Sequence, residues 1–202
     1  RRRLAILRDR NPLPIGTTAI GTGLVVNGIT TYAFLVVARR ALGDEAYGGL
    51  AVLWGLIYIL GPGLFQPLEQ ELARATANRA GRGEGSAPVF RQATRIGSVQ
   101  LAVVVVGAMV AWPLGLDGLL DDRIDLLVAL ILSMAAFMVA ECVRGVLSGR
   151  HEFTRYGAYF AAEGLSRVFL AGVLAAIGIE VVGAYAVAVG IAFAIATVVG
   201  VG

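Results

Sequence analysis

Hydrophobic and charged positions alternate along this chain on the scale of whole helices. Long stretches that are almost free of charge are separated by short clusters of charged residues. A helix needs about 20 apolar residues to cross a hydrocarbon core of about 30 Å. We therefore predict an all-α integral membrane protein, a bundle of six transmembrane helices. The predicted spans are residues 14–38, 46–68, 96–116, 126–147, 156–179 and 181–202.

The composition agrees with this pattern. Hydrophobic residues make up 57% of the chain and charged residues 15%, whereas typical soluble domains have roughly 45–50% and about 25%. This balance excludes an ordinary soluble domain. The formal net charge of +3 does not indicate a nucleic-acid partner, because the arginines flank apolar helices and form no patch with exposed aromatic residues.

The distribution of arginine predicts the orientation of the helices. Positively charged residues concentrate in cytoplasmic segments, and a cytoplasmic N-terminus, with residues 1–13 as its basic segment, puts most arginines inside. The outer loops then hold only Arg39, Arg40 and Arg123. The inner segments hold Arg1, Arg2, Arg3, Arg8, Arg10, Arg74, Arg79, Arg82, Arg91, Arg95, Arg144, Arg150 and Arg155. The long connection over residues 72–90 is rich in glycine and is predicted to be a flexible inner loop.

Two ionisable residues lie near the middle of the fifth predicted span. Glu163 and Arg167 are four residues apart, so they share one helical face in the order that favours an ion pair. Tyr159 and Ser166 lie on or beside the same face. Because charge inside a membrane costs at least a few kcal/mol, such a face lines a cavity or packs against another helix. The sequence leaves both interpretations open.

Weaker polar features occur in three other spans. Glu141 and Arg144 repeat the acid–arginine pairing three residues apart, with Arg144 near the cytoplasmic end. Asn27, with Thr30 and Thr31, is expected to form interhelical hydrogen bonds. Pro62 and Pro67 are candidate positions for a helix bend, which is either a moving part or a harmless kink. Glu69 and Glu71 follow the second span and are expected in the headgroup region.

The sequence holds no pattern of an enzyme. His151 is the only histidine and Cys142 the only cysteine, so we expect neither a metal site nor an intrachain disulfide. Ser148-Gly149 has no evident base beside it, and no P-loop is present. We therefore expect no catalytic residue and no cofactor.

Two segments carry a family resemblance. Residues 38–56 read ARRALGDEAYGGLAVLWGL, and residues 144–178 read RGVLSGRHEFTRYGAYFAAEGLSRVFLAGVLAAIG. The first resembles the LGxxxYGxxA-like stretch after the first helix of polysaccharide flippases, which are the Wzx-type members of the multidrug/oligosaccharidyl-lipid/polysaccharide (MOP) exporter superfamily. The second is similar to their linker between helices four and five, where a turn leads into a helix that carries an arginine.

The resemblance implies the N-terminal lobe of a transporter of 12 to 14 helices, built from two six-helix lobes around a central cavity. Such a protein lies in the cytoplasmic (inner) membrane of a bacterium and moves a lipid-linked sugar between leaflets by alternating access. The implied partners are the lipid bilayer, an anionic lipid-linked glycan and a second six-helix lobe. That second lobe is either a missing C-terminal half or another chain.

A cationic contact for an anionic glycan has candidates among the residues above. Arg167, and Arg144 after it, can supply the contact, with Glu163 and Glu141 holding each arginine until the substrate arrives. One alternative is a cation-coupled drug or metabolite antiporter of the same superfamily that uses Glu163, although Arg167 beside it disfavours proton cycling. Another is a non-transporting membrane scaffold of cell-envelope assembly.

Overall fold

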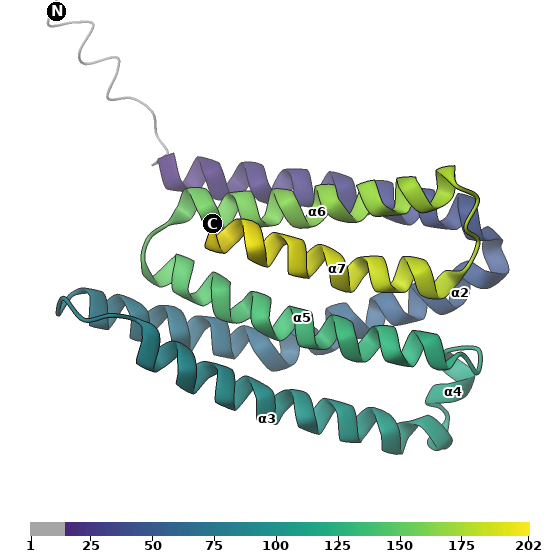
Figure 1. The fold of residues 1–202 in the computed structure, drawn as a ribbon, viewed down its shortest axis with the longest axis horizontal. Helices are drawn as coiled ribbons and strands as arrows, with labels where there is room; N and C mark the ends of the chain where they lie inside the picture. The colour runs from purple at the N-terminus through teal and green to yellow at the C-terminus, as the bar shows by residue number, and fades with distance from the viewer. Residues whose placement is uncertain (1–14) are drawn as a thin grey trace, which may run out of the picture.

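The computed structural model describes residues 15–202 (Figure 1). The predicted basic segment 1–13, with its five arginines, lies outside the described residues. All the elements of the described part are helices: α2 (Ile15–Ala80), α3 (Ala87–Ala111), the 3-10 helix η1 (Trp112–Leu114), α4 (Leu116–Leu119), α5 (Ile124–Gly149), α6 (Phe153–Ala176) and α7 (Val182–Val201). Five of them, in this described part, are long and apolar enough to cross a membrane.

The long helix α2 is divided into two arms at Gly43. This residue has φ 74° and ψ 170°, which only glycine adopts without strain. The chain reverses direction there, so that the second arm runs back towards the end of the bundle at which α2 begins (Figure 1). The expected loop between the first two spans is thus a sharp break inside α2, with helical backbone on both sides of it.

The second arm of α2 is longer than the second predicted span. The backbone stays helical to Ala80, and α3 begins at Ala87. The expected flexible connection over residues 72–90 is therefore a much shorter loop. Local charges support the extra helical turns, since Arg74 and Glu71 form an exposed ion pair of 2.7 Å between positions i and i+3.

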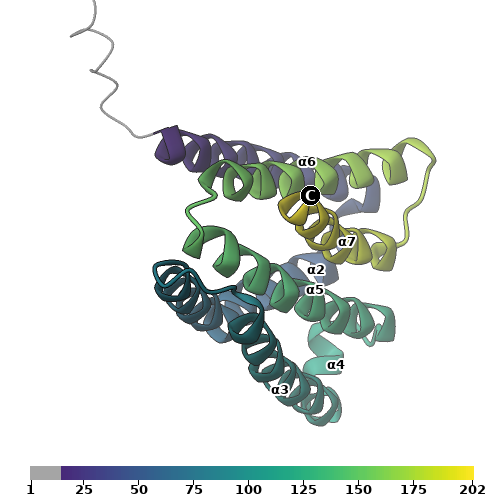
Figure 2. The same ribbon diagram turned by 60° about the vertical axis from the view of Figure 1, so that its left-hand side comes forward.

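The helices pack around α7 and α2. Helix α7 lies between α5 and α6, while both α5 and α6 pack against α2 (Figures 1 and 2). Helix α3 lies on the outside of α5 and the second arm of α2. Its outer face is apolar: Val99, Val103, Val106 and Met109 are each at least 60% exposed. An apolar outer face of this kind is what a helix facing lipid requires.

Small residues bring the first arm of α2 very close to α6. A Cβ on Gly23 would lie 2.2 Å from the carbonyl oxygen of Gly157, and a Cβ on Gly164 would lie 2.0 Å from Oγ1 of Thr30. Helices in membranes associate through such close contacts, because lipid is as apolar as their side chains. This crossing sets the position of α6, which carries Glu163 and Arg167.

A hydrogen bond joins the same two helices. Nδ2 of Asn27 donates to the carbonyl oxygen of Phe160 at 3.1 Å, which confirms the interhelical bonding expected of Asn27. Thr30 instead donates to the carbonyl of Val26 in its own helix, and Thr31 donates to Oδ1 of Asn27. The two threonines therefore satisfy their hydroxyls within α2.

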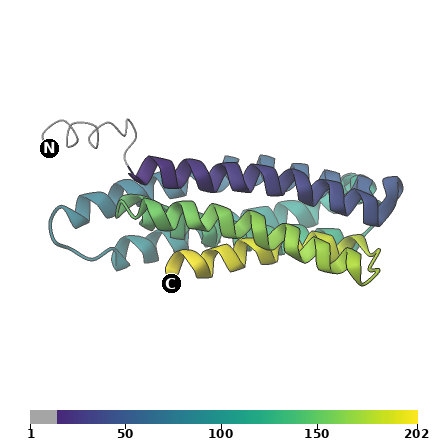
Figure 3. The ribbon, with the colours of Figure 1, turned by 90° about the horizontal axis from the view of Figure 1, so that it is seen from above.

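The long helices run along one common direction, so the bundle has two ends (Figures 1 and 3). One end holds the start of α2, the loop before α3, the turn between α5 and α6, and the end of α7. Arg79, Arg82, Arg150 and Arg155 lie at this end. The other end holds Gly43, η1 with α4, and the turn before α7. The arginine-rich segments are thus on one side, as the sequence pattern requires; which side faces the cytoplasm stays a prediction.

Candidate functional site

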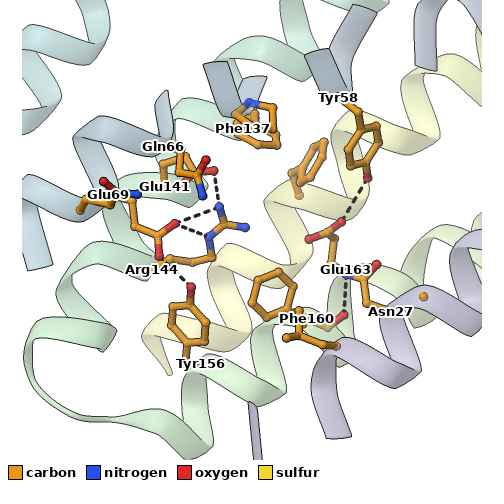
Figure 4. Close-up of a pocket in the computed structure, with 15 residues that line it drawn as sticks. Asn27, Tyr58, Gln66, Glu69, Phe137, Glu141, Arg144, Tyr156, Phe160 and Glu163 are labelled. Carbon is orange, nitrogen blue, oxygen red and sulfur yellow. Dashed lines mark hydrogen bonds and ion pairs between the residues drawn. The ribbon is translucent and has the colours of Figure 1, made fainter. Parts of the chain in front are cut away.

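A cavity of about 520 Å³ opens among α2, α5, α6 and α7 (Figure 4). Its lining combines aromatic side chains with carboxylates and amides. The residues are Leu24, Asn27, Gly28, Tyr58, Pro62, Gln66, Glu69, Gln70, Phe137, Glu141, Arg144, Tyr156, Phe160, Glu163 and Phe193. Volumes of roughly 300–1,000 Å³ are typical of sites for small ligands.

One wall of the cavity is a single face of the second arm of α2. Tyr58, Pro62, Gln66 and Glu69 follow each other at spacings of four, four and three residues. These spacings place side chains on one side of a helix. The same spacing is visible in the sequence and could have indicated this polar face. It contains no pair of opposite charges within one span, so a search for such pairs does not find it.

Arg144 on α5 is held by two carboxylates from different helices. Its Nη2 donates to Oε1 of Glu141, one turn earlier, and lies 3.1 Å from Oε2 of Glu69 on α2. The hydroxyl of Tyr156 on α6 donates to the other oxygen of Glu69 at 2.7 Å. The predicted pairing of Glu141 with Arg144 is confirmed, and Glu69 is an additional member. We call Glu69, Glu141 and Arg144 the triad.

Aromatic rings surround the guanidinium of Arg144. Its central carbon lies 5.8 Å from the ring centroid of Phe137, 5.5 Å from that of Tyr159 and 5.2 Å from that of Phe160. A cation within about 6 Å of an aromatic face is attracted by the electron-rich ring. The rings therefore stabilise the charge without neutralising it, and Arg144 is part of the cavity lining.

Glu69 is the main residue that sequence reasoning missed. The sequence pattern places Glu69 together with Glu71 beyond the second span, but the two carboxylates have different surroundings. The side chain of Glu69 is 13% exposed, and that of Glu71 is 62% exposed. The reason is that α2 continues as a helix past Leu68, so that Glu69 turns towards α5 while Glu71 turns away from the bundle.

Arg167 on α6 lies behind the cavity wall and is fully buried. Its Nη2 donates to Oε1 of Glu163 at 3.0 Å and to Oδ1 of Asn27 at 3.1 Å, and its Nη1 donates to the hydroxyl of Tyr58. The ring of Trp54 lies 5.0 Å from its guanidinium carbon. The predicted ion pair with Glu163 is thus present. Glu163, Asn27 and Tyr58 line the cavity, and Arg167 does not.

The other members of the expected polar face do not join this pair. Tyr159 is fully buried against Arg144, and its hydroxyl has no hydrogen-bond partner among residues 15–202. The hydroxyl of Ser166 donates to the carbonyl of Glu163 in its own helix at 3.1 Å. Neither residue lines the cavity. The face is divided because Tyr159 turns towards α5 and Ser166 bonds its own backbone.

The two prolines of α2 lie in helical backbone. In this helix only Gly43 has non-helical dihedral angles. Pro62 lines the cavity and Pro67 does not. A functional bend at Pro62 or Pro67 stays a prediction.

The acidic side chains of the triad outnumber its basic ones. In the triad, two carboxylates share one guanidinium, which leaves a formal charge of −1. Oε2 of Glu141 is buried without a hydrogen-bond partner in the described part of the chain. Glu163, by contrast, is matched by Arg167 one to one. The triad can therefore accept a cation or proton at Glu141, or offer Arg144 to an oxyanion that displaces a carboxylate.

An all-helical bundle with five long apolar helices and a polar cavity is consistent with a helical membrane protein. The chain is similar to uncharacterized proteins of Mycobacterium bovis and of two strains of Mycobacterium tuberculosis, with 27% identity over 169 residues. The similarity covers 81% of this chain and 38% of each relative, so the chain spans well under half the length of these curated relatives. No family model and no solved structure matches the chain.

Proposed function

We propose that this chain is one lobe of a membrane transporter that moves a lipid-linked glycan precursor across the cytoplasmic membrane by alternating access. One observation carries the proposal: Arg144 lines a polar cavity inside an otherwise apolar bundle. Ionisable residues inside membrane proteins are costly and usually mark a substrate or ion pathway. The resemblance of residues 38–56 and 144–178 to polysaccharide flippases supports the choice of substrate.

The helix arrangement supports the same proposal. With the two arms of α2 counted separately, the described bundle has six long helical segments. We propose that each segment crosses the membrane once, which would equal the number in one lobe of the exporters whose motifs the chain resembles. We propose that the arginine-rich end faces the cytoplasm. The remaining part of the transporter would then supply the opposite wall of the pathway.

Arg144 is the proposed contact for the anionic group of the glycan carrier. A guanidinium binds phosphate oxygens through two parallel hydrogen bonds, which a lysine cannot reproduce. Glu69 and Glu141 hold the arginine in place until a phosphate replaces one of them. Arg167 is the first candidate on sequence grounds, but its complete burial behind Glu163 favours a role in packing.

The test compares glycan export by variants of the full-length protein, in cells that lack their own copy. We expect Arg144→Gln to abolish export and Arg144→Lys to restore only part of it. Arg74→Gln is the matched control, because Arg74 is exposed and pairs only with exposed Glu71. Membrane abundance is measured for every variant.

Loss of Arg144 removes the ion-pair partner of both Glu141 and Glu69, of which Glu141 is the more deeply buried, so a further variant separates function from folding. Glu141→Gln with Arg144→Gln removes both charges of the pair and should restore abundance without restoring export. Normal export by this double variant would show that the arginine only supports packing.

A second candidate, cation-coupled exchange, rests on the formal charge of −1 and the unpartnered oxygen of Glu141. In that case the triad carries the coupling ion and the substrate binds elsewhere. The same assay distinguishes the two: Glu141→Gln would then uncouple transport from the pH or sodium gradient, while Arg144→Lys would retain full export. The one-to-one pairing of Glu163 with Arg167 makes Glu141, and not Glu163, the candidate acid.

A further inference from the structure

A second cavity, of about 500 Å³, lies at the arginine-rich end of the bundle. It is bounded by the start of α3, the ends of α5 and α7, and the start of α6, and it shares no lining residue with the first cavity. Its lining residues are Gly85, Ser86, Ala87, Phe90, Arg91, Val143, Val146, Leu147, Arg150, Glu152, Arg155, Gly200 and Val201. We call it the end pocket.

The end pocket is strongly cationic. Three arginines and one glutamate line it, which gives a formal charge of +2. Arg155 pairs with Glu152 at 2.9 Å, whereas Arg150 lies 3.9 Å from that carboxylate. Arg91 has no ion-pair partner among residues 15–202. The pocket therefore holds more positive charge than its own carboxylate can balance.

One of these arginines is held in a defined position. Nη2 of Arg150 donates to the hydroxyl of Ser86 at 2.7 Å. Ser86 is buried and precedes α3, but its hydroxyl makes no capping bond to that helix. The serine thus serves Arg150, and the bond ties the end of α5 to the start of α3 across the pocket.

The charged and apolar parts of the pocket are separated along the helix axis. Val143, Val146, Leu147 and Arg150 follow one face of α5, at spacings of three, one and three residues, from inside the bundle to its end. On α3, Phe90 and Arg91 are adjacent near the start of the helix, so the order in depth is carried by α5. A phospholipid has the same arrangement: its acyl chains require an apolar wall deep in the bundle, and its phosphodiester requires arginines near the end of the bundle.

We propose that the end pocket binds an anionic phospholipid, with its phosphodiester at Arg91, Arg150 and Arg155. Basic pockets between membrane helices bind anionic headgroups, and the apolar wall of this one gives a lipid an advantage over free phosphate. The inference is independent of the proposed transport, because it concerns separate residues and a structural ligand. A lipid bound in the end pocket would link α3 to α5, α6 and α7. Without it, α3 contacts the rest of the bundle only through its inner face.

The test measures binding of dioleoyl phosphatidylglycerol to the purified full chain by native mass spectrometry, with dioleoyl phosphatidylcholine as the neutral lipid. Each arginine near a membrane surface contributes about 1 kcal/mol, or about fivefold, to binding of anionic lipid. We expect Arg91→Gln with Arg155→Gln to weaken phosphatidylglycerol binding about 25-fold. Val146→Trp, which fills the apolar wall without changing charge, should also weaken it.

Arg95→Gln is the matched control. Arg95 lies on α3 one turn beyond Arg91, at the same end of the bundle, and does not line the pocket. Its variant should bind phosphatidylglycerol like the wild type. Equal losses from Arg95→Gln and Arg91→Gln would overturn the proposal in favour of general surface attraction. Displacement of the lipid by millimolar inorganic phosphate would overturn it in favour of a phosphate site, and wild-type binding by Val146→Trp would remove the role of the acyl chain.

Discussion

Arg144 and Arg167 carry the same charge within one bundle, but their surroundings differ. Arg144 lies at the cavity surface among three aromatic rings and two carboxylates. Arg167 is enclosed by Glu163, Asn27, Tyr58 and Trp54 and does not line the cavity that Arg144 lines. An arginine that meets only protein groups contributes to packing, whereas one at a cavity surface can exchange partners.

We therefore expect Arg167→Ala to act on stability. Removing one partner of a buried ion pair leaves an unpaired charge and costs about 3–5 kcal/mol. The thermal midpoint of the purified protein should fall sharply. Glu163→Gln with Arg167→Gln should recover most of the loss, since two amides can hydrogen-bond to each other. An Arg167→Ala protein with a normal midpoint but no transport would instead make Arg167 a substrate contact.

At the scale of elements, the first arm of α2 and α6 form the closest crossing in the bundle. Glycines on both helices allow their backbones to touch, and Asn27 adds a hydrogen bond across the crossing. Since Asn27 also binds Arg167, the crossing sets the position of the buried pair. The position at which α6 crosses the first arm of α2 thus determines where Glu163 lies in the cavity wall.

We expect Gly157→Ala to destabilise the bundle. Its new methyl group would lie 2.2 Å from the carbonyl oxygen of Ala19, which is part of a helix backbone and cannot turn away. Overpacking of this kind costs about 1–3 kcal/mol. Gly172→Ala on the same helix meets nothing within 4 Å and should be neutral or slightly stabilising. Urea or thermal unfolding in detergent measures both, and equal stability of the two variants would contradict the importance of the crossing.

At the scale of the whole molecule, the described arginines of segments 74–95 and 150–155 lie towards one end of the bundle, and Arg39, Arg40 and Arg123 lie towards the other. The distribution of arginine along the sequence and the direction of the helices are therefore consistent with the same orientation in a membrane. The end pocket belongs to the arginine-rich end, and the triad lies deeper in the bundle from that end.

The orientation can be tested with single cysteines in a Cys142→Ala background. Gly85 and Gly118 are exposed at opposite ends of the bundle. A thiol reagent that does not cross membranes should label Gly118→Cys on intact cells, and should label Gly85→Cys only after the cells are opened. Ser86 is unsuitable for this purpose because it is buried. Labelling of Gly85→Cys on intact cells would reverse the proposed orientation.

The sequence by itself predicted the apolar helices and the ion pairs within them. Both depend on residues close together in the chain: helix length follows from the length of the apolar stretch, and the Glu141–Arg144 and Glu163–Arg167 pairs follow from spacings of three and four residues. The break at Gly43 was predicted only as a loop, because charge marks the end of a span but not its backbone angle.

Only the tertiary structure decided which polar residues share a cavity. Glu69 joins Arg144 across 75 positions, and Asn27 reaches Arg167 across 140. Such contacts depend on how each helix is rotated and how closely its neighbours approach, which here follows from the glycine crossing of α2 with α6. Local spacing carries no information about that rotation. For this reason the sequence favoured Arg167 as the substrate contact, and the packed bundle favours Arg144.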